Sequence, residues 1–133
     1  REHSTAEARQ KLLEQGYEPK VVEQVIADFT ERRLLDDARY ASHFVASHAG
    51  RGQGPVRIRL ELRELGLADP QIEEALAEGP DFRALCRSLR ERRFGAEAPL
   101  DWAEKAKQIR FLQYRGFSLD HIRSALGPDI ELE

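Results

Sequence analysis

The stretch that decides the fold is KLLEQGYEPKVV at residues 11–22, and it returns twice at intervals of fifty residues. The later copies are ELRELGLADPQI at 61–72 and FLQYRGFSLDHI at 111–122. A glycine just past a helix end adopts the left-handed backbone conformation that a Cβ would penalise. In the Schellman ending, the residue after that glycine packs on the residue four before it. The repeat therefore predicts three such endings, at Gly16, Gly66 and Gly116, with the pairs Leu12–Tyr17, Leu62–Leu67 and Leu112–Phe117.

A second helix is expected after each glycine. Pro19 and Pro70 suit a first helical turn, and Asp69 and Ser118 can act as N-caps. The apolar residues that follow recur at spacings of three and four, which places them on one face of a helix. They are Val22, Val25 and Ile26, then Ile72, Ala75 and Leu76, then Ile122, Ala125 and Leu126.

A third helix is expected in two of the repeats. Asp36 can cap a helix with Tyr40, Ala41, Phe44 and Val45 on one face, and a helix from Asp81 places Phe82, Leu85, Cys86 and Leu89 together. Asp101 with Glu104 opens another helix, and Ser4 with Glu7 forms a capping box. No stretch shows the alternation of a strand. We predict an all-α protein of about eight helices, with tandem three-helix repeats at 1–50, 51–98 and 99–133 (the last cut to two helices), stacked into one elongated, curved body.

Length and composition are those of one globular domain. The chain has 133 residues, of which 41% are hydrophobic and 34% charged, and no apolar run approaches the roughly 18–20 residues of a membrane-spanning helix. The single Cys86 cannot form an internal disulfide, which fits a reducing cytoplasm. Because the chain contains no Met, we expect residues to precede Arg1 in the full-length protein.

The charge is distributed unevenly. A net charge of −3 argues against a uniformly basic DNA-binding protein. Arginines nevertheless cluster at 51–63 and 83–93, whereas acids concentrate at Asp36-Asp37 and at Asp129, Glu131 and Glu133. Only four of the 21 basic residues are Lys, and arginine favours bidentate contact with carboxylate or phosphate. A solvated helix face is an equally good interpretation of any one cluster.

No motif for catalysis is present. The phosphate loop, HExxH and GxSxG patterns are absent, and the four histidines (3, 43, 48 and 121) lack metal-ligand spacing. Cys86 lies on an apolar helical face and is interpreted as a packed thiol, and Asp36-Asp37 as a helix start rather than a metal site. The glycine-rich segment 51–55 is interpreted as a flexible connector. We expect neither enzyme activity nor a cofactor or metal.

A binding surface of arginines remains. Arg59 and Arg63 are four residues apart, Arg83, Arg87 and Arg90 form a stripe that Arg93 extends, and Arg110 and Arg115 flank Tyr114. Such side chains bind phosphate oxygens and acidic protein patches equally well. A net-negative chain with basic stripes suits a protein partner that is itself bound to nucleic acid. The candidate partner- or DNA-binding residues are Arg57, Arg59, Arg63, Arg87, Arg90, Arg110 and Arg115.

The chain resembles the RecX family of bacterial RecA regulators. The resemblance is carried by residues 1–4 with 11–13, by 35–47 with 52–67, and by 93–95 with 107–117. It departs at His48, where the family often has Arg, and in the thin basic run before Gly52. The resemblance implies a fold of tandem three-helix repeats. It also implies binding in the groove of the RecA–single-stranded DNA filament, with inhibition of its ATP hydrolysis, strand exchange and co-protease activity, and no cofactor.

Two other functions remain open on the sequence alone. Three-helix units resemble helix-turn-helix proteins, so the chain could be a stand-alone DNA-binding module with salt-sensitive binding. It could also be a helical-repeat scaffold for another acidic protein. In each case we expect a monomer in the cytoplasm with no contact to a membrane.

Overall fold

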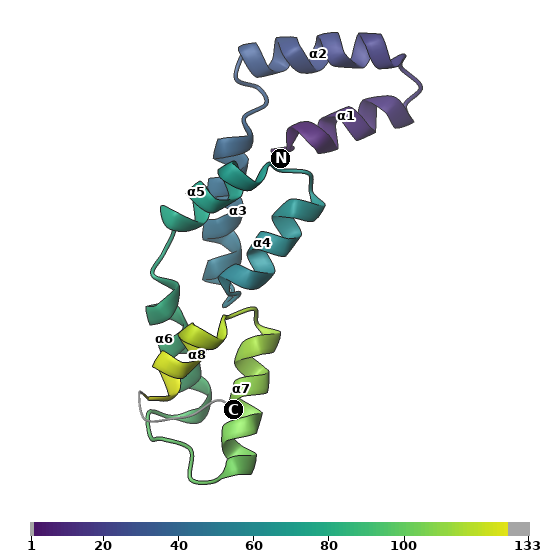
Figure 1. Ribbon diagram of the computed structural model, residues 1–133. Helices are drawn as coiled ribbons and strands as arrows, with labels where there is room; N and C mark the ends of the chain where they lie inside the picture. The colour runs from purple at the N-terminus through teal and green to yellow at the C-terminus, as the bar shows by residue number, and fades with distance from the viewer. Residues whose placement is uncertain (1, 128–133) are drawn as a thin grey trace. The chain divides into compact units, whose positions relative to one another are not determined.

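The computed structural model describes residues 2–127, so Arg1 and the acidic residues Asp129, Glu131 and Glu133 lie outside the described part. Within this range the chain forms eight α-helices and no strand, which confirms the all-α prediction (Figure 1). The helices are α1 (Thr5–Glu14), α2 (Pro19–Glu31), α3 (Asp37–Gly50), α4 (Pro55–Glu64), α5 (Asp69–Ala77), α6 (Phe82–Phe94), α7 (Trp102–Tyr114) and α8 (Leu119–Leu126).

The three predicted glycine endings are present and join α1 to α2, α4 to α5, and α7 to α8. Gly16, Gly66 and Gly116 have φ angles of +94°, +86° and +95°. The N–H groups of Tyr17, Leu67 and Phe117 donate to the carbonyls of Leu12, Leu62 and Leu112 at 3.3, 3.2 and 3.1 Å. Each glycine N–H also donates to the carbonyl three residues earlier, at 2.9 to 3.1 Å. This hydrogen-bond pair defines the Schellman motif, so the prediction is confirmed.

Most of the predicted helix starts are confirmed as well. Ser4 and Glu7 form the capping box, with hydrogen bonds of 3.1 and 3.2 Å. The side chains that accept a hydrogen bond from the N–H three residues later are Asp36, Asp81, Asp101 and Ser118. The predicted cap at Asp69 is wrong, because Ala68 is the N-cap of α5 and Asp69 is already helical. The Asp69 carboxylate instead accepts from Arg63 Nε at 2.9 Å.

The chain divides into two compact units. The first unit comprises residues 1–45 and 59–78, and the second comprises 46–58 and 79–133. In the first unit α1 lies beside α2 (Figure 1), and Val22, Ile26 and Leu35 form a core covered by Ala8, Leu12 and Phe29. In the second unit α6 packs on α7 and α8. Its buried apolar residues include Phe82, Cys86, Leu112, Phe117, Ile122 and Leu126.

Segment 51–55 in the second unit is ordered by hydrogen bonds, which corrects the expectation of a flexible connector. The N–H groups of Gly54 and Val56 donate to the carbonyls of Arg115 and Gly116 at 2.8 and 2.9 Å. A Cβ on Gly54 would lie 2.4 Å from the Gly116 carbonyl oxygen, and one on Gly116 would lie 2.3 Å from Arg57 Cβ. The two backbones therefore touch because both positions are glycine.

A related contact, made by side chains instead of the backbone, occurs fifty residues earlier, inside the first unit. The Ser4 hydroxyl donates to the Leu65 carbonyl at 3.2 Å, and a Cβ on Gly66 would lie 2.5 Å from Ala6 Cβ. Ser4 corresponds to Gly54 in the repeat, as Leu65 corresponds to Arg115. The endings at Gly66 and Gly116 thus each receive the chain segment that begins another helix.

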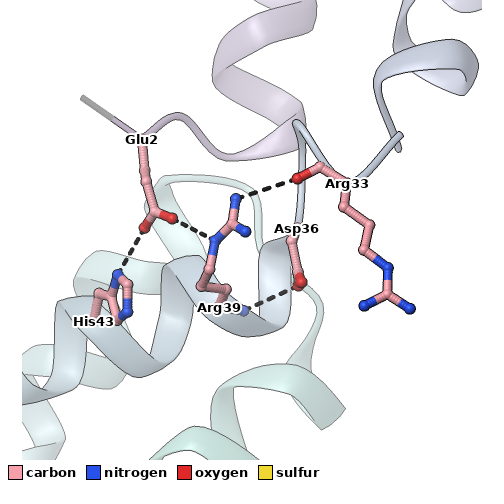
Figure 2. A network of polar contacts seen from close by, with 5 residues as sticks. All are labelled: Glu2, Arg33, Asp36, Arg39 and His43. Carbon is pink, nitrogen blue, oxygen red and sulfur yellow. Dashed lines mark hydrogen bonds and ion pairs between the residues drawn. The ribbon is translucent and has the colours of Figure 1, made fainter. Parts of the chain in front are cut away.

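The first residues of the chain are also bound to α3, as Figure 2 shows. The Glu2 carboxylate accepts a hydrogen bond from Arg39 Nε and lies 2.9 Å from His43 Nδ1. Arg39 also donates through NH2 to the Arg33 carbonyl at 3.4 Å. Desolvation would raise the pKa of Glu2, but the hydrogen bonds from Arg39 and His43 outweigh it, and the pKa is lowered.

Gly54→Ala should destabilise the protein by about 2 kcal/mol, because the new methyl group would overlap the Gly116 carbonyl. Gly50→Ala is the matched control, since a Cβ there meets open space at the end of α3, and it should raise stability by up to about 1 kcal/mol. Urea denaturation monitored by circular dichroism measures both. Equal stability of the two variants would contradict the described backbone contact.

Glu2→Gln should lower stability at neutral pH and have little effect in acid. A carboxyl whose folded-state pKa is depressed contributes stability above its unfolded pKa, and this contribution is lost as the pH falls through the folded pKa. Denaturation midpoints of parent and variant should therefore converge as the pH drops below the usual carboxyl range. Glu97→Gln is the control, because the Glu97 carboxylate has no partner within residues 2–127, and a constant gap for Glu2→Gln would refute the role of the network in Figure 2.

Candidate functional site

A cavity of about 700 Å³ lies in the second unit, and five of the side chains that line it are cationic. Arg51, Arg92, Arg93, Lys107 and Arg115 surround it together with Leu89 and Phe94, and no Asp or Glu among the described residues lines it. We call this site the basic cavity. Its charge makes it the strongest candidate for a functional site in residues 2–127.

Most of the cations of the basic cavity lie at the C-terminal ends of helices. Arg51 directly follows α3, Arg92 and Arg93 lie in the last turn of α6, and Arg115 caps α7. The carbonyl end of a helix carries partial negative charge, which favours cations there. Gly52, with a φ angle of +85°, closes α3 and leaves the Arg51 carbonyl free to accept from Arg115 NH1 at 3.3 Å.

Two phenylalanine rings support these cations. Phe94 and Phe111 meet edge to face with their centroids 5.5 Å apart. The guanidinium carbons of Arg93 and Arg115 lie 4.4 and 5.4 Å from the Phe111 centroid. Lys107 Nζ lies 6.0 Å from the Phe94 centroid. These cation–π contacts hold the charges in place without neutralising them.

The cations of the basic cavity are not paired with carboxylates in the part of the chain that the structure describes. Arginines elsewhere are paired, for example Arg9 with Glu23 at 2.8 Å and Arg83 with Asp120. In the cavity, the additional contact of Arg51 is the Ser47 hydroxyl at 3.0 Å. The cavity therefore has several guanidinium donors available for an anionic ligand.

The sequence-predicted arginines fall into different surroundings. Arg59 binds Glu73 through two hydrogen bonds of 2.7 and 3.1 Å, which raise the pKa of Arg59 and lower that of Glu73, and Arg63 binds Asp69. Arg57 is half-buried beside Gly116. Arg87 and Arg110 are exposed and have no partner within residues 2–127. Of the predicted set, Arg115 alone lines the basic cavity.

Arg90 does not lie on the predicted exposed stripe. Its side chain is buried, with 2% of the residue exposed, and Nε donates to Gln108 Oε1 at 3.0 Å. The two terminal nitrogens donate to the carbonyls of Ala96 and Glu97. Each of the three guanidinium nitrogens therefore donates one hydrogen bond, which holds the loop between α6 and α7 against Gln108. This corrects the expectation that Arg90 lies exposed on one stripe with Arg83 and Arg87.

The candidate list based on sequence omitted four of the five cavity cations: Arg51, Arg92, Arg93 and Lys107. Arg51, Arg92 and Arg93 belonged to the recognised arginine clusters, but nothing in those clusters separated them from surface charges. Their position in the last turn or just past the end of a helix that stops at Gly52 or Gly95 was the available signal.

The sequence also contains one thiol and four histidines, and the structure describes the surroundings of Cys86 and His121. Cys86 is buried, and desolvation raises the pKa of its thiol to about 12, which confirms the interpretation as a packed thiol. Desolvation, and then the charge of Arg83, lower the pKa of His121. Residues 2–127 contain no group of three or more His, Cys, Asp and Glu side chains placed to hold a metal ion. None of the described helices is long and apolar enough to span a bilayer.

The fold and the cavity define an all-α protein that is built from three-helix domains and carries a cationic cavity. The chain belongs to the RecX family, since three family models match it in order over most of its length. They are the first three-helix domain of RecX at residues 1–29, the second at 36–76 and the third at 81–126. In these models the second and third domains begin at α3 and α6. The repeats predicted from the sequence were instead counted from the first residue of the chain, and their boundaries at 50 and 98 stay a prediction.

Curated relatives and solved structures agree with this family. The regulatory protein RecX of Halorhodospira halophila is 48% identical over 94% of this chain and 78% of its own length. That of Pseudomonas fluorescens is 42% identical over 98% of this chain and 86% of its own length. The crystal structure of RecX from Lactobacillus salivarius has the same fold, with a TM-score of 0.81 at 22% identity, covering 94% of this chain and 84% of that one.

Arg90→Lys should destabilise the protein by about 2–4 kcal/mol, because a lysine cannot make the three directed contacts of the buried guanidinium. Arg87→Lys, on the exposed side of the same helix, should change stability by less than about 0.5 kcal/mol. Thermal and urea denaturation of both variants test this difference. Equal stabilities would mean that Arg90 is not held as described.

Proposed function

We propose that this chain is a negative regulator of RecA that binds the RecA–single-stranded DNA filament and inhibits its ATPase, strand-exchange and co-protease activities. Membership of the RecX family supports a regulatory role, since the curated relatives are named regulatory proteins. The observation that carries the proposal is the basic cavity, where five cations lack carboxylate partners among the described residues. The proposed regulator acts by binding and needs no cofactor or metal.

The charge of the two units supports a partner made of protein and nucleic acid. The first unit contains 9 Lys and Arg against 15 Asp and Glu, a net charge of −6. The second unit contains 12 against 9, a net charge of +3, and it holds the basic cavity. A complex of RecA with DNA can offer a protein surface to the acidic first unit and phosphates to the basic second unit.

The proposed contact residues differ in whether their hydrogen-bond donors are available to a partner. Arg87, Arg110 and Arg115 retain donors for a partner, since no carboxylate within residues 2–127 binds them. Arg59 and Arg63 would have to exchange Glu73 and Asp69 for the partner's acids or phosphates. Arg57 remains in the proposed set as a half-buried residue at the docked start of α4. Arg90 leaves the set because its donors are used internally.

The direct test is the DNA-dependent ATP hydrolysis of RecA with and without a stoichiometric excess of this protein. The proposal requires a clear fall in the rate. An unchanged rate would refute it. Salt-sensitive binding to duplex DNA in a gel shift, without any effect on RecA, would instead favour a stand-alone DNA-binding module.

The double variant R87A/R110A should inhibit RecA several-fold less than the parent at equal concentration, because two exposed cations without carboxylate partners in the described chain are removed. R32A/R123A is the matched control, with the same loss of charge from two exposed arginines outside the proposed set. Circular dichroism should show equal helicity for both. Identical inhibition by the two double variants would mean that Arg87 and Arg110 are only solvated surface residues.

A further inference from the structure

The basic cavity brings positive charges together, and no carboxylate among the described residues lines it. Five cations from three helix ends and α7 line a single cavity of about 700 Å³. Like charges at such proximity repel one another, and cation–π contacts with Phe94 and Phe111 hold three of them, Arg93, Lys107 and Arg115, in place. An anionic ligand would remove this repulsion. Because helix C-termini face the site, side-chain donors rather than backbone N–H groups would bind such a ligand.

The donors match phosphate chemistry. Four of the five cations are arginines, whose planar forks bind phosphate oxygens with two parallel hydrogen bonds. Five charges exceed what one phosphate group can neutralise. A ligand with a regular series of phosphates, such as a nucleic-acid backbone, can satisfy several of them together.

A stripe on α7 extends the site and adds an aromatic ring. Lys107, Arg110 and Tyr114 are separated by three and then four residues, so they lie along one face of the helix. Lys107 lines the basic cavity, Arg110 is exposed, and Tyr114 is 77% exposed. An exposed ring beside a row of cations is the arrangement that binds unpaired bases by stacking while the backbone is held electrostatically. A purely acidic protein surface would make no use of the ring.

We propose that the basic cavity and the stripe Lys107–Arg110–Tyr114 bind the backbone of single-stranded nucleic acid, with phosphates at the cations and one base stacked on Tyr114. This inference rests on the proposed function, because we take the bound strand to be the single-stranded DNA of the RecA filament. It assigns the DNA contact to the second unit and to named residues.

The test measures fluorescence anisotropy of a fluorescein-labelled single-stranded oligothymidylate with the full chain and no RecA. R92A/K107A should bind roughly tenfold more weakly than the parent, and the slope of log affinity against log salt should fall by about 0.7 for each cation removed. Both residues are exposed and pack little of the core, so folding should be retained. R32A/R123A should bind like the parent. Equal binding by the two double variants would overturn the proposal.

Substitutions at Tyr114 test the stacking of a base on its ring. Y114A should weaken binding by several-fold, whereas Y114F keeps the ring and should restore parental binding. Equal weakening by both would exclude stacking. An unlabelled polyglutamate peptide of matched charge should compete poorly for the oligonucleotide, and competition equal to that of unlabelled oligonucleotide would overturn the proposal in favour of an acidic protein partner.

The same proteins in the RecA ATPase assay separate the two proposals. A chain that inhibits RecA but binds no oligonucleotide would refute the cavity assignment and leave the regulator intact. A chain that binds oligonucleotide through the cavity but leaves RecA unaffected would support the assignment and refute the regulator.

Discussion

The structure depends on helices that end in a left-handed glycine. At Gly66 and Gly116 this conformation completes the hydrogen bonds of the helix end. The carbonyl of the residue before the glycine accepts from the Ser4 hydroxyl in one unit and from the Gly54 N–H in the other, where the Gly116 carbonyl also accepts from the Val56 N–H. Since glycine has no Cβ, the incoming backbone can approach to contact distance. One backbone conformation therefore both ends a helix and receives the start of another.

The basic cavity follows from the same geometry. Arg115 directly precedes Gly116 and Arg51 directly precedes Gly52, so each arginine stands where a helix ends. Docking of Gly54 on the Arg115 carbonyl brings these two ends together, and Arg115 donates to the Arg51 carbonyl. The helix dipoles favour cations at this place, and the ring of Phe111 supports Arg115. A structural contact thus creates a concentration of positive charge.

The division of charge explains how a chain of net charge −3 can still present a basic site. Arginines of the first unit are largely balanced by acids, as in the pairs Arg9–Glu23 and Arg59–Glu73. Arginines of the cavity are not balanced in this way within the described residues. Exposed ion pairs contribute little stability, so their main effect here is to neutralise one surface and leave the other charged.

The sequence by itself determined the eight helices, the three glycine endings, nearly all of the helix caps and the family, because each is encoded by residues within a few positions of one another or by the repeated register. It misplaced the cap at Asp69 by one residue and treated segment 51–55 as flexible. Arg87 and Arg90 looked equivalent in the sequence, yet one is exposed and the other buried. Only the tertiary structure decided this, because Arg90 bonds to the loop after α6 and to Gln108, and Arg51 accepts from Arg115 far along the chain. Helical periodicity carries no information about such contacts.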